Sequence, residues 1–465
     1  MTAAGASALD RFLRPFTVVR DGEAPTTLLL TGNVFLLLTA YYVIKPVREA
    51  LILAASGAEV KSYAAAGQAL LLLLLVPLYG RLADRLPRRR LLNAVTGFFV
   101  ACLVAFYLLA EAGVRVGIPF FLWVGIFNLM IVAQFWSFAN DLYSREQGER
   151  LFPIVAFGAS LGAVLGSGVA GALIPLVGVP QLLPVAALLL AVAAALGNLA
   201  DRRERRRCEA GLPPRFTTAE IPAATGEYLV QEAGGTAQVT VSLAGAPSRP
   251  GTFRLVFESR YLLGIALLLL VVNWVNTTGE YVLGRTVAAA AEAAVAGGTA
   301  DGLGVADFIG RFYSRFFLGV NLAGLLLQLL VVPRLLRLAG VRVAVLVLPA
   351  VALLGYALLA FVPLLGVVRW VKTAENATDY SLQNTVRNVL FLPTTREQKY
   401  KAKQVIDGFF VRAGDVLAAL YIYLGTTVLA LGPREFALGN LVLVLAWLGL
   451  AVGTGRGYAR LTGAT

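Results

Sequence analysis

Residues 28–55 read LLLTGNVFLLLTAYYVIKPVREALILAA, an apolar run that carries Lys45, Arg48 and Glu49 in its second half. The run is long enough to cross a bilayer as a helix, which takes about 20 residues. Each charged side chain inside such a segment costs about 3 kcal/mol or more unless it faces protein, water or a charged partner. The stretch therefore predicts a membrane helix with a functional site, and two cations against one anion favour an anionic ligand.

The rest of the chain has the composition of a polytopic membrane protein. Of its 465 residues 58% are hydrophobic and 14% are charged, and the mean hydropathy is +0.75, well outside the averages of soluble proteins. Apolar runs of spanning length recur twelve times. They cover residues 28–55, 60–80, 91–111, 118–140, 152–174, 180–200, 260–284, 308–332, 343–362, 364–391, 403–430 and 436–455.

The net charge of +13 is explained by where the basic residues lie. With the N-terminus inside, the cytoplasmic segments carry most of the Arg and Lys, whereas the opposite loops carry few, such as Lys61, Arg115 and Arg434. This asymmetry is the positive-inside rule. We therefore expect an integral protein of the bacterial inner membrane with both termini in the cytoplasm, in contact with the lipid bilayer and with no nucleic-acid partner.

Several classes of chemistry are excluded by residue content. The chain has no His and only two Cys, Cys102 and Cys208, which the span assignment places in different compartments. His-based metal sites and Ser-His-Asp triads cannot form. The stretch 166–171 matches GxGxxG, but it lies in an apolar span with Gly158 and Gly162, a pattern typical of close helix packing. We expect no cofactor, no metal and no enzyme activity.

The spans divide into two groups of six around a polar segment. We expect a cytoplasmic N-terminal segment (1–26), a first six-helix half (27–200), a cytoplasmic linker (201–256), a second six-helix half (257–456) and a cytoplasmic tail (457–465). A short repeat, SREQ at 144–147 and TREQ at 395–398, follows the fourth span of each half and indicates duplication. Within the linker, residues 227–243 form either a small hairpin or part of a flexible tether.

The loop after the second span, residues 80–90 (GRLADRLPRRR), resembles the signature G-x-L-A-D-R-x-G-R-R of the major facilitator superfamily, with Pro87 in place of glycine. The resemblance implies an all-α fold of twelve transmembrane helices in two six-helix halves. It also implies that charged residues of this loop pair across the cytoplasmic gate in one conformation and separate in the other. The expected gating residues are Asp84, Arg85, Arg88 and Arg89.

In this superfamily helices one, four, seven and ten line the central cavity, and in this chain each has a polar face. Tyr41, Lys45 and Arg48 share one face of the first helix. The tenth carries the stripe Lys372, Asn376, Asp379, Gln383, Asn384 and Arg387; the seventh carries Asn273, Asn276, Thr277 and Glu280; the fourth carries Asn128, Trp136 and Asn140. An alternative is that Lys45, Arg48 and Glu49 snorkel to the outer interface and that Arg387 is an inner-interface charge.

The same residues resemble the ATP/ADP exchangers, the nucleotide transporters of plastids and intracellular bacteria. The similarity rests on KPVREAL at 45–51, FWSFAN at 135–140, and YSL at 380–382 followed by Arg387, Pro393, KAK at 401–403 and Ile406-Asp407. It implies that Arg48 and Arg387 take the substrate-binding basic positions. The chain departs from the family pattern at two acidic positions. Val124 stands where the family has an acidic residue in the fourth helix, and Glu280 lies one position away from the place of the family's seventh-helix glutamate.

The leading functional hypothesis is therefore a monomeric carrier that exchanges nucleotides or related phosphorylated anions by alternating access. The expected substrate-binding residues are Tyr41, Lys45, Arg48, Asn140, Asn276, Glu280, Asn384 and Arg387. One alternative is a proton-coupled organic-anion transporter with Glu280, Asp379 or Glu49 as the proton site. Another is a membrane sensor that binds a nucleotide without transporting it.

Overall fold

The computed structural model describes residues 19–20, 22–85, 88–143, 145–209, 251–395 and 398–462, and every regular element among them is a helix. The first half contains α2 (Ala24–Arg85), α3 (Arg88–Glu111), α4 (Gly117–Leu142), α5 (Arg145–Val177) and α6 (Leu182–Glu209). The expected hairpin at 227–243 lies outside the described residues.

The second half begins with the short helix α7 (Gly251–Glu258) and has more interruptions than the first. Its elements are α8 (Arg260–Ala296), α9 (Val305–Leu326), η1 (Leu327–Val331), α10 (Val332–Phe361), α11 (Leu365–Thr378), η2 (Asp379–Gln383), α12 (Asn384–Leu390), η3 (Gln398–Ala402), α13 (Lys403–Val405), η4 (Ile406–Phe410), α14 (Val411–Tyr423), η5 (Leu424–Val428) and α15 (Pro433–Thr462). The η segments are π-helical: their backbone hydrogen bonds join residues five apart, instead of four apart as in an α-helix.

Two continuous helical stretches each contain two membrane passages, one within α2 and the other running from α9 through η1 to the end of α10. In α2 the helical backbone breaks at Gly57, whose φ of 83° belongs to the left-handed region that glycine enters without a Cβ clash. Gly340 does the same in α10, with a φ of 70°. These glycines let consecutive spans turn back on each other without a long loop.

The helices account for all twelve expected spans. Eight helical stretches of the described chain are long and apolar enough to cross a membrane, and two of these, Ala24–Leu72 with 49 residues and Val305–Phe361 with 57, suffice for two crossings each. The tenth span is the helix interrupted by η2, and the eleventh is the helix interrupted by η4 and η5.

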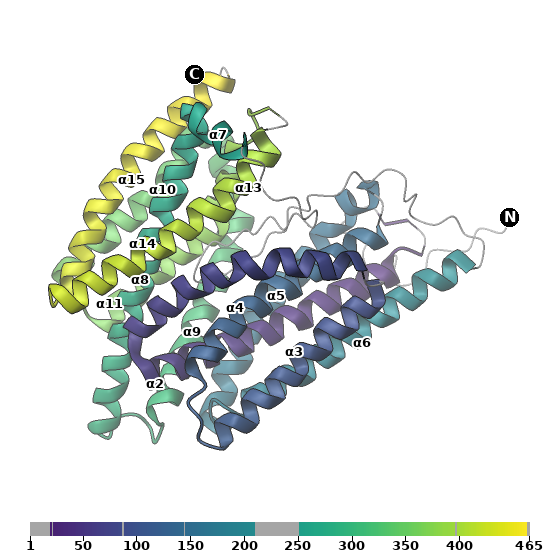
Figure 1. Ribbon diagram of the computed structural model, residues 1–465, viewed down its shortest axis with the longest axis horizontal. Helices are drawn as coiled ribbons and strands as arrows, with labels where there is room; N and C mark the ends of the chain where they lie inside the picture. Colours follow the sequence, from purple (N-terminus) through teal and green to yellow (C-terminus); the bar gives the residue numbers. More distant parts are fainter. Residues whose placement is uncertain are drawn as a thin grey trace.

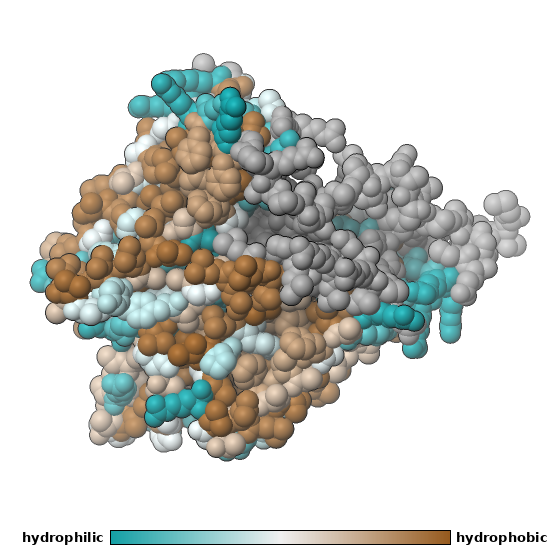
Figure 2. Space-filling view, in the orientation of Figure 1, coloured by the Kyte–Doolittle hydropathy of each residue, from teal (hydrophilic) through white to brown (hydrophobic). Residues whose placement is uncertain are grey.

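The surface of the spans is apolar. Large apolar side chains such as Leu176 and Phe361 are exposed, and Figure 2 shows broad hydrophobic surface over both halves. Such a surface is suited to lipid contact.

The fifth span packs on the first through a row of glycines. A Cβ on Gly158 would lie 2.6 Å from the Thr31 side chain, and one on Gly162 or Gly166 would approach the Phe35 or Thr39 carbonyl oxygen at least as closely. The four-residue spacing of these glycines brings the two backbones together, as expected for the glycine pattern around 158–171.

Replacing Gly162 with alanine is therefore expected to destabilise the fold by about 1 to 3 kcal/mol, because the added methyl group overlaps the Phe35 backbone. Gly168 on the same helix provides a matched control, because its Cβ would meet nothing within 4 Å. Thermal unfolding in detergent would measure both variants. Equal stability of Gly162→Ala and Gly168→Ala would contradict this packing.

The start of α2 is fixed to the start of α5 by Glu23. Arg150 donates to both carboxylate oxygens of Glu23 at 3.0 and 3.1 Å, Gln147 donates at 3.1 Å, and the Arg20 backbone N–H donates at 2.9 Å. Burial by itself raises the pKa of Glu23, but these hydrogen bonds together with the Arg150 charge outweigh it and lower the pKa below its ordinary value of 4.5.

A carboxylate with a lowered pKa stabilises the folded state above its ordinary pKa, and this contribution disappears as the pH falls through the pKa of the folded protein. We therefore expect wild type to be more stable than Glu23→Gln at neutral pH, with the difference shrinking below about pH 4.5. Unfolding of both proteins across that pH range measures the effect. A difference that grows on acidification would show that ionised Glu23 destabilises the fold.

The two halves contact each other at one end, which we call the joined end. There Asn321 of α9 donates to the Ser167 hydroxyl of α5 at 3.2 Å, the Val179 N–H donates to Asp307 at 2.9 Å, and the Tyr63 and Tyr423 rings lie 6.2 Å apart. Figure 1 shows the halves diverging from this contact toward the end of the molecule at which α2 begins and α15 ends. Polar residues near the middle of the first span therefore lie next to the second half.

Candidate functional site

Lys45 is enclosed by aromatic rings from both halves. Its ammonium nitrogen lies 4.4 Å from the ring centre of Phe317 in α9, 5.5 Å from that of Tyr42 and 5.8 Å from that of Tyr41. The residue is only 1% exposed. A snorkelling side chain would extend to the surface, so the interface-anchor alternative is wrong for Lys45. A desolvated ammonium against aromatic faces is a cation–π arrangement.

One turn farther along α2, Glu49 is held between two cations. Arg48 donates to Glu49 Oε1 at 2.6 and 3.0 Å, and Lys61 Nζ lies 2.6 Å from Oε2. The Arg48 guanidinium also lies 4.8 Å from the ring centre of Phe121. The expectation that Lys61 belongs to an outside loop is wrong: the break at Gly57 turns the second passage back on the first, and Lys61 becomes a buried helix residue facing Glu49.

Glu280 of α8 connects this cluster to the second half. Its Oε2 lies 3.9 Å from Lys61 Nζ, its Oε1 lies 3.7 Å from Lys372 Nζ, and Asn376 donates to Oε1 at 3.1 Å. The contact between Lys61 and Glu280 crosses from the first half to the second. Glu280 is therefore placed where a movement of one half against the other would change its ion pairs.

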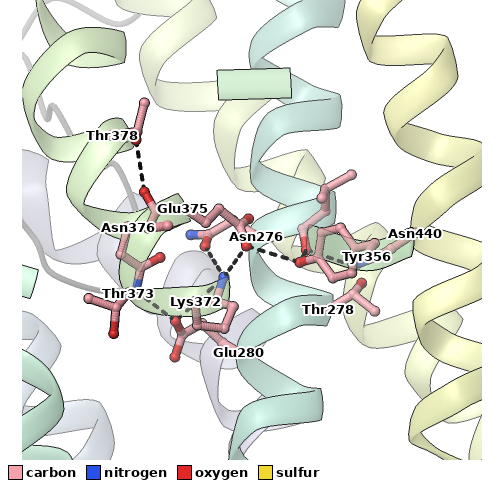
Figure 3. A network of polar contacts seen from close by, with 12 residues as sticks. Asn276, Thr278, Glu280, Tyr356, Lys372, Thr373, Glu375, Asn376, Thr378 and Asn440 are labelled. Carbon is pink, nitrogen blue, oxygen red and sulfur yellow. Dashed lines mark hydrogen bonds and ion pairs between the residues drawn. The ribbon is translucent and has the colours of Figure 1, made fainter. Parts of the chain in front are cut away.

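Lys372 of α11 is the centre of the second-half part, as Figure 3 shows. It is fully buried, and its ammonium donates to Asn276 Oδ1 at 2.9 Å and to Glu375 Oε2 at 3.0 Å. The Tyr356 hydroxyl donates to the same Glu375 oxygen at 3.3 Å. A side chain at Gly279 would collide with the Tyr356 hydroxyl, so this position of α8 must be small.

These contacts form one continuous set of ion pairs, which we call the inter-half network. Its members are Arg48, Glu49 and Lys61 of α2, Glu280 of α8, and Lys372 and Glu375 of α11. Three positive and three negative side chains make the network neutral as a whole. Removing one member of a buried ion pair leaves a charge without compensation inside the protein. The network therefore stabilises the contact between the two halves only while each charge keeps its partners.

Arg387 is placed differently from the expectation. The sequence predicts that Arg387 binds the anion from the second half while Lys45 and Arg48 bind it from the first, but in the structure the Arg387 guanidinium forms a buried ion pair with Asp407 of η4, within the second half. The second-half cation that is connected to Arg48 and Glu49 is Lys372. The polar stripe of the tenth span had placed Lys372 on the cavity-facing side, but its partner helices could not be read from the sequence.

The other predicted residues fall into three groups. Asn276 and Glu280 are contacts of Lys372, and Tyr41 lies against Tyr42 and Phe127 beside Lys45. Asn384 and Asn140 are partly exposed, the latter near the end of α4. The expected gating residues Asp84, Arg85, Arg88 and Arg89 lie at the end of α2 and the start of α3, and their side chains are outside the described part of the structure.

Sequence reasoning missed Lys61 and Glu375 as members of the site, and it placed Lys372 on the polar stripe without counting it among the substrate-binding residues. Lys372 and Glu375 are three residues apart on one helix, a spacing at which opposite charges pair, and this signal could have been used. Among the described residues no group of three or more Cys, Asp and Glu side chains is placed to share a metal ion.

Comparison with solved structures identifies the fold. A bacterial homologue of the human lysosomal transporter Spinster, in an inward-facing and unoccupied conformation, matches with a TM-score of 0.56 and 14% identity over 94% of this chain and 98% of that chain. The transporter PepTSo of the POT family matches with a TM-score of 0.58 and 13% identity, over 95% and 98%. The nucleoside transporter NupG matches with a TM-score of 0.56 and 15% identity, over 94% and 99%.

No family model matches the chain, and no curated protein does. The structural matches show that the chain is an all-helical polytopic membrane protein with the major facilitator fold. The fold expected from the loop at residues 80–90 is therefore confirmed.

Proposed function

We propose that this protein is a secondary transporter that carries an anionic solute by alternating access between its two halves. The observation that carries the proposal is the set of cations buried where the halves meet: Lys45 against Phe317 of the second half, and Lys61 within reach of Glu280. The major facilitator fold is a fold of transporters rather than of enzymes, and the matched structures are described as transporters. Solutes in such carriers bind near the midplane between the halves.

The charge and the aromatic surroundings of Lys45 support a phosphorylated solute that carries a ring. Cations that are desolvated by protein attract anions more strongly than exposed ones do. Tyr41 and Tyr42 have aromatic faces beside Lys45, and stacking on such faces tolerates any nucleobase. Together with the resemblance to ATP/ADP exchangers, this favours a nucleotide or a related phosphorylated anion.

Alternating access requires the joined end to open, and the inter-half network opposes that opening. Separating Lys61 from Glu280 removes the one ion pair of this network that crosses between the halves, and each charge then has one partner fewer in a low-dielectric environment: Lys61 keeps Glu49, and Glu280 keeps Lys372. A bound anion can replace the Glu280 carboxylate beside Lys61 and so lower the cost of opening. This gives a physical reason for exchange, because a carrier that holds an anion would reorient more readily than an empty one. With the N-terminus inside, the end at which the halves diverge faces the cytoplasm.

The proposal is tested by ligand-dependent stability and by flux. Purified protein is screened by thermal shift with ATP, ADP, a sugar phosphate and a dicarboxylate, because a ligand that binds only the folded state raises the free energy of unfolding by about 2.7 kcal/mol at 100 times its Kd. Counterflow into liposomes then tests whether the ligand that binds is also transported.

Lys45→Ala and Arg48→Ala are expected to weaken binding of that ligand roughly 10- to 100-fold, the loss associated with a charged hydrogen bond of about 1.5 to 3 kcal/mol. Arg254→Ala is the matched control, because Arg254 is an exposed cation on α7. Wild-type transport by both site variants would refute the anion site. Saturable binding without any flux would instead favour the sensor function.

A further inference from the structure

The polar face of the tenth span has an ion pair at each end. At one end Lys372 pairs with Glu375 at 3.0 Å, and at the other Arg387 pairs with Asp407. Asp379 lies between them, at the first position of the π-helical segment η2. Since a helix rises about 1.5 Å per residue, Asp379 is about 10 Å from Lys372 and about 12 Å from Arg387 along the axis.

Asp379 differs from the other buried carboxylates of the described chain. Its residue is 4% exposed, its Oδ1 atom has no hydrogen-bond partner, and it forms no ion pair with any described residue. The other buried carboxylates all have an Arg or Lys within ion-pair distance: Glu23, Glu49, Asp201, Glu280, Glu375, Asp407 and Asp415. An isolated buried carboxylate is costly as an anion and becomes neutral by binding a proton.

The charged groups around Asp379 oppose one another. Glu375 lies one turn before Asp379 on the same span and carries a like charge, whereas Lys372 and Arg387 carry the opposite charge at the two ends of the stripe. Among the packed elements, α10 contributes the Tyr356 hydroxyl, which is occupied by Glu375, α9 approaches η2 through Gly324, and η1 has no titratable residue. The adjacent buried groups on η2 itself are the Tyr380 hydroxyl and the Gln383 amide, neither of which has a hydrogen-bond partner.

We propose that Asp379 is a proton-binding site of this carrier. Its carboxylate takes up one proton to become a carboxylic acid, and it becomes a carboxylate again when it releases that proton. Its position at the start of a π-helical segment supports a functional role, since such segments occur frequently at functional sites. Asn384 and Arg387 lie five and eight residues farther along the same polar stripe, so the proton site shares this stripe with two of the expected substrate residues.

The site would couple proton movement to solute movement. This step rests on the proposed function. An ionised Asp379 repels an anion near Arg387 or Lys372, and a bound proton removes that repulsion. Because coupling between two binding sites is reciprocal, the anion then increases the affinity for the proton by the same factor. Proton and anion are therefore expected to cross the membrane in the same direction.

The first test needs no solute. Infrared difference spectra of the protein in liposomes, titrated from about pH 8 to about pH 5, report the carbonyl band of protonated carboxyl groups. We expect wild type to gain a band that is absent from Asp379→Asn and shifted in Asp379→Glu, while Glu146→Gln, which removes an exposed carboxylate, retains it. Identical bands in wild type and in Asp379→Asn would overturn the proposal.

The second test uses tritium-labelled ATP as the probe. Wild type is expected to accumulate it when the proton gradient is directed inward, whereas Asp379→Asn loses that stimulation and keeps counterflow without a gradient. Gradient-driven accumulation by Asp379→Asn at the wild-type level would overturn the coupling. If wild type moves no ATP at all, the nucleotide assignment fails, and the infrared titration still decides whether Asp379 binds a proton.

Discussion

Lys372→Met is expected to unfold with a free energy about 3 to 5 kcal/mol below that of wild type, the usual loss when one partner of a buried ion pair is removed. The substitution leaves Glu280 and Glu375 without the ammonium group that lies 3.7 and 3.0 Å from them, inside the protein. Chemical or thermal denaturation of the purified protein in detergent would measure the loss.

Two further variants identify the cause. Lys372→Met combined with Glu375→Gln is expected to recover part of the stability, because the second change removes one uncompensated negative charge. Lys401→Met makes the same substitution at an exposed lysine and is expected to have a small effect. If the double variant is less stable than Lys372→Met alone, electrostatic compensation is not the reason for the loss.

Arg387→Leu is expected to cost a similar 3 to 5 kcal/mol, because Asp407 remains buried without its partner. The informative comparison is with Arg387→Leu combined with Asp407→Leu. Replacing a buried pair by apolar residues is often neutral or stabilising, so the double variant is expected to regain the lost stability. Denaturation curves of the three proteins measure this difference.

Transport by the double variant separates the two roles of Arg387. If Arg387 binds the anion, the stable double variant remains inactive in liposome counterflow. If it transports like wild type, the Arg387–Asp407 pair only supports the packing of α12 against η4, and Arg387 is not a substrate residue.

Much of the site could be predicted because charged residues in apolar spans are conspicuous. Lys45, Glu280 and the stripe from Lys372 to Arg387 are identified by hydropathy and by helical periodicity alone, and all of them except the partly exposed Asn384 are buried in the structure. Lys61 was missed because it lies at the edge of an apolar run, where a loop residue and a helix residue look alike in the sequence. Only the left-handed backbone at Gly57 shows that the chain turns there and that the residue enters the protein.

The sequence by itself determined the membrane-spanning fold, the division into two halves and the residues on each polar face. These properties depend on the composition of single segments and on the 3.6-residue period, which are local. The tertiary structure decided which charges meet across helices: Lys61 with Glu49 and Glu280, Lys372 with Glu280, and Arg387 with Asp407. Periodicity fixes the face of one helix but not its rotation against helices about 200 residues away, and ion pairing depends on that rotation within about 4 Å.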